Sequence, residues 1–161
     1  VFWREESIYA QGEPGEGLYI IVSGKVKLSR HLADGRQQVV VVGPSDIFGA
    51  SSALDGAPRT ATATSITDVA AVCMERDTIR ALLVESPAVA EHLLRLLARR
   101  LRRTDDDLID LFCTDGAGRV ARWLLQLAAR FGTYDGGELR VTLDVTQADI
   151  ALLIAWARNG E

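Results

Sequence analysis

Residues 47–65 of this chain, IFGASSALDGAPRTATATS, combine the residue types that can bind an anion. Gly49 stands at a turn where the backbone could approach a ligand closely, and the short run after it can form a helix whose first N–H groups are unpaired. The turn at 55–58 then places Arg59 and Thr60 at the start of a strand rich in Thr and Ala, and both side chains donate hydrogen bonds. We call residues 47–65 the cassette and predict that it binds an anion. The residues alone leave open a second interpretation, a hairpin with an exposed Arg59.

This chain has few residues that could act in catalysis or bind a metal ion, because it contains only two histidines and two cysteines. His31 is expected in a hairpin and His92 on a helix, so the two histidines are not expected to lie together. This excludes the cluster of His and Glu metal ligands that a cupin-type enzyme needs. It also gives no sign of a nucleophile paired with a histidine base. Cys73 and Cys113 have no metal-ligand spacing and cannot supply the cysteine cluster of an iron–sulfur sensor. We therefore expect a binding protein without a resident metal, and not an enzyme.

The composition narrows the class of protein further. A length of 161 residues suits one domain, or one domain with a small appendage, and 48% apolar residues can fill a core. The formal net charge of −4 argues against a protein that coats nucleic acid by charge alone. No run of about 18 apolar residues and no leader segment is present, so we expect a cytoplasmic protein. Because the chain begins at Val1, inside an expected strand, we interpret it as a fragment.

The cassette belongs to a series of short strands that spans residues 1–85. Apolar residues alternate with a period of two in 18–23 and 26–28, and β-branched residues dominate 37–42. Turn-forming segments separate these runs: Gly12–Gly17 is rich in Gly and Pro, and Asp34-Gly35 favours a tight hairpin. Strands at 60–65 and 69–74 complete the series. This spacing predicts a small antiparallel barrel or jelly roll, followed by a helix at 76–85.

A long helix is predicted next. Ser86-Pro87 supplies a capping hydroxyl and a proline at the first helical position, and the helical pattern continues to about Phe112. Thr104 interrupts a row of leucines on this helix, and its hydroxyl either reaches a bound ligand or is solvated. The leucines recur at alternating spacings of three and four, which predicts a homodimer seam; a helix packed only on its own barrel is the alternative. The predicted seam consists of Leu94, Leu97, Leu101, Leu108 and Leu111.

The remaining residues predict a small helical part. Apolar residues at helical spacing indicate a helix over 116–131, and Gly132–Gly137 is expected to be a loop. Residues 138–143 alternate like a short strand. Thr146 is expected to cap a third helix, with Asp149 three residues later in the manner of a capping box.

Several short motifs accompany this order of parts. They are Gly12-Glu13-Pro14-Gly15, Phe48-Gly49, Asp55-Gly56-Ala57-Pro58-Arg59-Thr60-Ala61, Ala98-Arg99-Arg100-Leu101, Gly118-Arg119-Val120-Ala121 and Thr146-Gln147. In these motifs and in the order of its parts, essentially the whole chain resembles the cyclic AMP receptor protein (Crp/Fnr) family of bacterial transcription regulators. It is especially similar to actinobacterial members.

The resemblance implies an α+β fold in three parts: a cyclic-nucleotide-binding β-roll at 1–85, a dimerisation helix at 86–112 and a partial winged helix-turn-helix at 113–161. Cyclic AMP is the implied effector, and DNA is the implied partner of the homodimer. Arg59 and Thr60 would hold the cyclic phosphate, with Arg100 near it, and Thr104 would read the adenine amino group. The implied ligand-binding set is Gly49, Ala50, Ser51, Arg59, Thr60, Arg100, Thr104 and Asp105. The implied DNA contacts are Thr146, Gln147 and Arg158.

Two positions depart from the family pattern. The cyclic-nucleotide sensors of the family carry Glu after the Phe-Gly pair to bind the ribose 2′-hydroxyl, whereas this chain has Ala50, a loss of about 1.5–3 kcal/mol of binding. Where the family turns through a Gly and begins its recognition helix with Ser-Arg-Glu, this chain has Ala155-Trp156-Ala157-Arg158-Asn159-Gly160 and stops after Glu161. Two hypotheses follow. One is a regulator that senses a cyclic nucleotide and is incomplete in its recognition helix; the other is a dimeric ligand-binding module with weakened nucleotide binding and no specific DNA binding.

Overall fold

The computed structural model describes residues 1–113, 116–142 and 144–158. For the helical residues 100, 103, 106–113, 116, 119, 123 and 153–158 it describes the backbone alone. The chain divides into two compact units, Val1–Ala90 and Glu91–Glu161, each with its own contacts. We describe each unit by itself.

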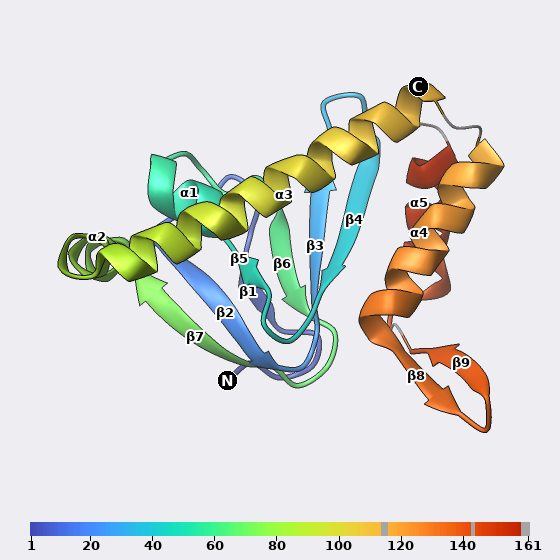
Figure 1. Ribbon diagram of the computed structural model, residues 1–161, viewed down its shortest axis with the longest axis horizontal. Coiled ribbons are helices and arrows are strands. Elements are labelled where there is room, and N and C mark those ends of the chain that lie inside the picture. Colours follow the sequence, from blue (N-terminus) through green and yellow to red (C-terminus); the bar gives the residue numbers. More distant parts are fainter. Residues whose placement is uncertain (114–115, 143, 159–161) are drawn as a thin grey trace. The chain divides into compact units, whose positions relative to one another are not determined.

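The first unit is built on two antiparallel sheets (Figure 1). The four-stranded sheet has the order β1 (Ser7–Tyr9), β6 (Thr62–Ser65), β3 (Val26–His31) and β4 (Gln37–Val42). The three-stranded sheet has the order β5 (Ile47–Phe48), β2 (Gly17–Ser23) and β7 (Ala70–Glu75). These strands confirm the antiparallel β-roll predicted from the sequence. The strand predicted at 60–65 begins two residues later than expected, so Arg59 and Thr60 precede β6.

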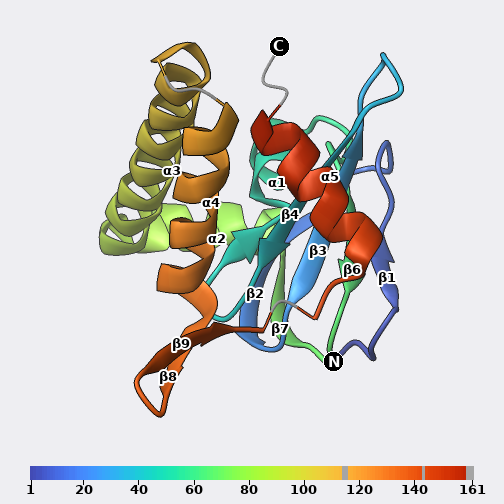
Figure 2. The same cartoon turned by 90° about the vertical axis from the view of Figure 1, so that its right-hand side faces the viewer.

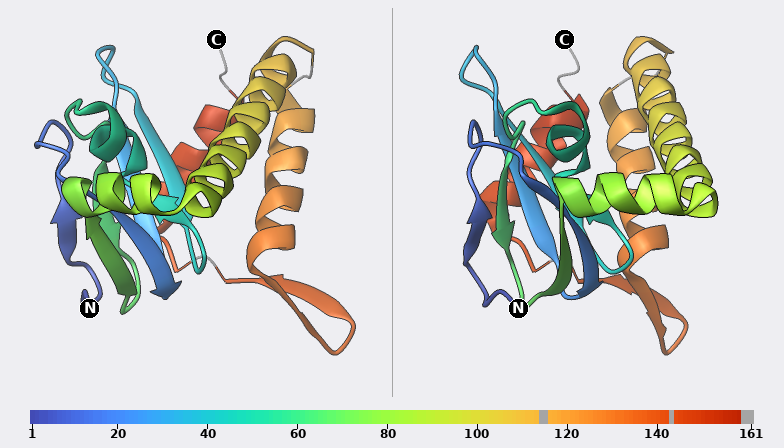
Figure 3. Two further views of the ribbon diagram at one scale, coloured as in Figure 1. Left: turned by 60° about the vertical axis from the view of Figure 1, so that its left-hand side comes forward. Right: turned by 90° about the vertical axis from the view of Figure 1, so that its left-hand side faces the viewer.

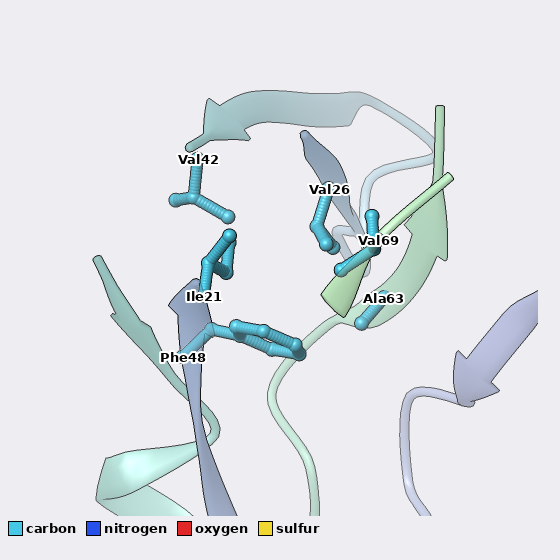
Figure 4. Packing of buried hydrophobic residues seen from close by; sticks show 6 residues of the cluster. All are labelled: Ile21, Val26, Val42, Phe48, Ala63 and Val69. Atoms are coloured by element: carbon cyan, nitrogen blue, oxygen red, sulfur yellow. The ribbon is translucent and has the colours of Figure 1, made fainter. Parts of the chain in front are cut away.

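The core of the roll is formed by side chains from both sheets (Figure 4). Ile21 of β2 and Phe48 of β5 come from one sheet, and Val26 of β3 comes from the other; each is at most 1% exposed. The period-two pattern of β2 explains this arrangement, because alternate residues of a strand point to opposite faces. The full cluster is Ile21, Val26, Val42, Phe48, Ala63 and Val69.

The other face of β2 is covered by two helices, α1 (Ala50–Asp55) and α2 (Arg76–Glu85). Contacts place α1 beside β2 and α2 beside β7 (Figure 3). Leu18 of β2 packs there in a second cluster with Ala53 of α1 and Ile79 of α2. One face of the three-stranded sheet therefore packs in the core of the roll, and its other face packs against helices α1 and α2.

Helix α3 (Pro87–Cys113) begins at the proline that the sequence predicted as its first helical residue. The backbone N–H of Val89 donates to the carbonyl oxygen of Ser86 at 3.0 Å, which anchors the first turn. Three leucines of the predicted seam are exposed, at 66% for Leu94, 37% for Leu97 and 62% for Leu101. The side chains of Leu108 and Leu111 lie outside the described part of the chain.

The second unit also contains α4 (Gly116–Phe131), β8 (Gly132–Asp135), β9 (Glu138–Val141) and α5 (Gln147–Arg158). The prediction of a loop over 132–137 is wrong. Residues 132–135 form β8, which pairs with β9 in an antiparallel hairpin (Figure 2). Gly136 and Gly137 connect the strands at φ values of 59° and 87°, and consecutive glycines at positive φ suit a two-residue hairpin turn. The expected last residue of the second strand, Leu143, lies outside the described residues.

The capping box at the start of α5 is confirmed. Thr146 Oγ1 donates to Asp149 Oδ2 at 2.8 Å, and the Asp149 backbone N–H donates to Thr146 Oγ1 at 3.1 Å. Within the described residues, no helix is long and apolar enough to cross a membrane. The same described residues contain no group of three or more His, Cys, Asp or Glu that could hold a metal ion.

Candidate anion-binding site

Arg59 is the central residue of the cassette, and it is buried, with 5% of its surface exposed. Its Nη1 donates to the carbonyl oxygen of Gly49 at 2.8 Å, and its Cζ lies 4.2 Å from the centroid of the Tyr9 ring. Its Nε is fully buried and has no hydrogen-bond partner. Among the described residues, no carboxylate forms an ion pair with this guanidinium. The alternative interpretation of an exposed Arg59 is therefore excluded.

The buried guanidinium is suited to contact with a negatively charged group. A cation removed from water is stable only when it is paired or hydrogen-bonded, and here one hydrogen bond and the rings of Tyr9 and Tyr19 replace water around the guanidinium. A phosphate or carboxylate that reached the guanidinium would supply the missing acceptor and the missing charge. The arrangement is suited to binding an anion.

Gly49 makes this placement of Arg59 possible. It lies immediately before α1 at φ 73°, a conformation that glycine adopts without strain. A β-carbon at Gly49 would lie 2.5 Å from Arg59 Nη1, so any other residue would displace the guanidinium. Gly49 therefore contributes both the acceptor oxygen and the space for the arginine.

The backbone of Arg59 is held by the turn segment that precedes β2. The N–H of Arg59 donates to the carbonyl oxygen of Glu13, and the N–H of Gly12 donates to the carbonyl oxygen of Arg59, both at 2.8 Å. Sequence reasoning identified this segment as turns and missed its role as the support of Arg59. The two bonds fix the direction in which the arginine leaves the backbone.

Aromatic rings form the wall beside the guanidinium. Tyr19 and Phe48 stack with their centroids 5.0 Å apart, and Tyr9 lies 5.9 Å from Phe48. Burial raises the pKa of Tyr19, and the neighbouring Cys73 thiol raises it further, while the charge of Arg59 acts in the opposite direction. Sequence analysis missed both tyrosines as site residues. The period of β2 places Tyr19 on the inward face with Ile21, but nothing in the sequence connects Tyr9 with Arg59.

The structure brings together only part of the ligand-binding set named from the sequence. Ala50 follows Gly49 and is 4% exposed, in the apolar cluster with Leu18 and Ile79. Ser51 and Thr60 are exposed, and Thr60 directly follows the buried Arg59. Three other members of the set belong to α3 in the second unit. Of these, Thr104 and Asp105 are exposed, and the side chain of Arg100 lies outside the described part.

Of the three DNA-binding residues named from the sequence, Thr146 engages its hydroxyl in the cap of α5. Gln147 is the first residue of α5 and is exposed. The side chain of Arg158 lies outside the described part. Thr146 and Gln147 lie at the start of α5 and Arg158 is its last residue, so α5 does not bring the three residues together.

Comparison with known proteins gives consistent matches. The family described as cyclic nucleotide-binding domain matches residues 1–86. The chain is 54% identical over 159 residues to the CRP-like cAMP-activated global transcriptional regulator of Mycobacterium tuberculosis, covering 98% of this chain and 71% of that protein. It is 40% identical over 121 residues to the cyclic AMP receptor protein of Thermus thermophilus, covering 74% of this chain and 56% of that protein.

Solved structures agree with these sequence matches. FixK2 from Bradyrhizobium japonicum superposes with a TM-score of 0.75 at 28% identity, covering 96% of this chain and 75% of the other. The catabolite activator protein of Thermus thermophilus superposes with a TM-score of 0.64 at 28% identity, covering 97% of this chain and 87% of the other.

Proposed function

Because this chain belongs to the Crp/Fnr family of transcription regulators, we propose that its cassette binds a cyclic nucleotide, with cyclic AMP as the first candidate. The proposal rests on one observation: Arg59 is a buried guanidinium whose Nε has no acceptor. A cyclic nucleotide carries one negative phosphate, which would pair with Arg59. A cytoplasmic location is part of the proposal.

In this proposal the ligand contacts form two groups. Gly49, Arg59 and Thr60 hold the phosphate in the first unit, with Ala50 and Ser51 beside the sugar. Thr104 and Asp105 of α3 take the base, with Arg100 near the phosphate. The mechanism is charge neutralisation at a buried site: the anion stabilises the guanidinium, and the guanidinium holds the anion away from water.

Calorimetric titration with cyclic AMP tests the proposal. We expect wild-type binding, and we expect Arg59→Gln to weaken it by about tenfold or more, because the buried phosphate would lose its charged partner. Arg30→Gln is the matched control, since Arg30 is an exposed arginine of β3 in the same unit. The absence of binding heat at about millimolar cyclic AMP, or equal binding by the Arg59 and Arg30 variants, would overturn the proposal.

We also propose that the protein acts as a homodimer through α3. The support is the row of exposed leucines, Leu94, Leu97 and Leu101, on a helix of 27 residues. Leucines exposed in a row at heptad spacing are stable in water when a second helix covers them. A symmetric pairing of two copies would do so, because each copy presents the same surface to the other.

A second candidate function, ligand binding without specific DNA recognition, is favoured by the cap of α5. The Thr146 hydroxyl donates to the Asp149 carboxylate, which is 6% exposed. A DNA phosphate approaching Thr146 would therefore meet an occupied hydroxyl next to a negative charge. A gel-shift titration distinguishes the two candidates. Selectivity of about a thousandfold for a palindromic site over a scrambled one supports the regulator, and weak, unselective binding supports the second candidate.

A further inference from the structure

Strand β1 has a bulge that turns Tyr9 toward the interior of the roll. Ser7 of β1 lies opposite Thr64 of β6. The next aligned pair is Tyr9 with Ala63, so two steps along β1 correspond to one step along β6. Ala63 is fully buried in the core cluster, and residues directly opposite one another in paired strands point to the same face. In a regular pairing Ile8 would lie opposite Ala63 and Tyr9 would point outward. The bulge therefore places the Tyr9 ring on the inner face of the sheet.

The inward ring of Tyr9 supports the guanidinium of Arg59. Cζ of Arg59 lies 4.2 Å from the centroid of the Tyr9 ring and 5.9 Å from that of Tyr19. The negative face of an aromatic ring attracts a cation at such distances, and the attraction is larger where water is excluded. Arg59 is 5% exposed, so most water is excluded from this contact. Tyr9 is therefore the ring that contributes most to holding the charge in place.

Neighbouring rings and a backbone carbonyl fix the geometry of this contact. The Tyr9 centroid lies 5.9 Å from Phe48 and 5.9 Å from Tyr19, separations at which aromatic rings attract one another. Phe48 is 1% exposed, and the residue after it, Gly49, accepts the hydrogen bond from Arg59 Nη1. The ring of Tyr9 and the carbonyl of Gly49 thus hold one guanidinium from two different parts of the roll. Nε of the same guanidinium stays without an acceptor.

We propose that Tyr9 is a positioning residue for the anion site: its ring keeps the guanidinium of Arg59 oriented before a ligand arrives. The inference rests on the proposed function for the identity of the ligand. A group that is already held in its binding orientation loses less conformational freedom when the ligand binds, so the affinity is higher. Without the ring, the long side chain of Arg59 would reach other orientations, and binding would have to restrict them. The bulge of β1 is thus a part of the ligand site, although β1 lies outside the cassette.

Calorimetric titration of Tyr9 variants with cyclic AMP tests the role of the ring. Tyr9→Leu removes the aromatic face and should weaken binding by about fivefold. Tyr9→Phe keeps the ring and should bind within about twofold of the wild type. Phe2→Leu is the matched control: Phe2 packs against the same core cluster, with its centroid 6.1 Å from Tyr19, and its variant should lose stability but bind like the wild type. Equal binding by the wild type and Tyr9→Leu, or equal weakening in Tyr9→Leu and Phe2→Leu, would overturn the inference.

Two ligand-free measurements separate failure of this inference from failure of the proposed function. In urea unfolding, the effects of Tyr9→Leu and Arg59→Gln on stability should be non-additive, because either change alone removes the same contact. In NMR spectra, the Nε–Hε resonance of Arg59 is assigned by its absence in Arg59→Gln. This resonance should shift in Tyr9→Leu, which removes the ring current beside it, and change little in Tyr9→Phe and Phe2→Leu.

Additive effects on stability, or an unmoved resonance in Tyr9→Leu, would refute the positioning role whether or not cyclic AMP binds. If both ligand-free results are as expected and the wild type does not bind cyclic AMP, the contact between Tyr9 and Arg59 is supported and the proposed function alone is refuted.

Discussion

The Nη1 atom of Arg59 lies 2.8 Å from the carbonyl oxygen of Gly49, and a β-carbon added to Gly49 would lie 2.5 Å from that same nitrogen. The two residues are therefore complementary: the arginine occupies the volume that a side chain at position 49 would fill. The contact also ties the position of a buried charge to the start of α1. A change at Gly49 must affect the anion site even though the glycine itself carries no charge.

Gly49→Ala is expected to destabilise the protein by about 1–3 kcal/mol and to weaken cyclic AMP binding by about tenfold or more. The backbone at position 49 would have to adopt a positive φ that is strained for alanine, and the new β-carbon would clash with the Arg59 guanidinium. Gly35→Ala is the matched control: Gly35 has φ 83°, and a β-carbon there would meet no atom within 4 Å. Urea unfolding and calorimetry of both variants separate the effect of strain from that of the clash. An equal effect of the two variants on binding would show that Gly49 does not position Arg59.

Ala50→Glu addresses the position where the family's cyclic-nucleotide sensors carry a carboxylate. Ala50 is 4% exposed in an apolar cluster, so the new carboxylate would lose hydration in the ligand-free protein and lower its stability. Cyclic AMP should bind about tenfold more tightly to this variant, because the ribose 2′-hydroxyl would donate to the carboxylate. The 2′-deoxy analogue is the control and should gain nothing. Equal gains for both nucleotides, measured by calorimetry, would contradict a role for position 50 at the ribose.

The sequence alone predicted the β-roll, the start of α3 and the cap of α5, because each depends on neighbours in the chain. The period of two in β2, the Ser86-Pro87 pair and the Thr146–Asp149 spacing are local signals with local physical causes. The one wrong assignment, β8, had a signal too. The Gly136-Gly137 pair favours a hairpin turn, and such a turn requires a strand on each side, which the prediction of a loop over 132–137 does not include.

The burial and surroundings of Arg59 could not be predicted in the same way. Tyr9 comes from β1, Gly12 and Glu13 from a turn, and Phe48 from β5, so the site depends on contacts between residues far apart in the chain. Arg76 is a still clearer case. As the first residue of an amphipathic helix it resembles any exposed arginine, and only the fold brings the carbonyls of α1 to it.

Leu101→Glu tests the proposed homodimer. Leu101 is 62% exposed at the centre of the predicted seam, and a glutamate there would bury an unpaired carboxylate between two helices. Sedimentation should show a dimer for the wild type at micromolar concentration and a shift toward monomer for the variant. Leu125→Glu is the control, because Leu125 is 70% exposed on α4, which is not part of the predicted seam, and its variant should remain dimeric. A monomeric wild type, or a dimeric Leu101→Glu, would refute the seam.

Tyr19→Phe tests the aromatic wall through its pH dependence. Burial, followed by the effect of Cys73, raises the pKa of Tyr19 above its ordinary value of 10.0. The folded protein therefore holds the phenol proton more tightly than the unfolded chain does. The stability that this difference represents is fully present below pH 10.0 and is lost as the pH rises through the raised pKa. Part of the alkaline loss of stability should thus disappear in Tyr19→Phe.

The measurement is the free energy of unfolding in urea at roughly pH 8 and roughly pH 11, on either side of the ordinary tyrosine pKa. Other groups titrate in this range in both proteins, so the difference between wild type and variant isolates Tyr19. Tyr134→Phe is the control, since Tyr134 is 81% exposed on β8 and its replacement should leave the alkaline slope unchanged. Identical slopes for the wild type and Tyr19→Phe would show that the phenol beside Arg59 is not held protonated by the fold.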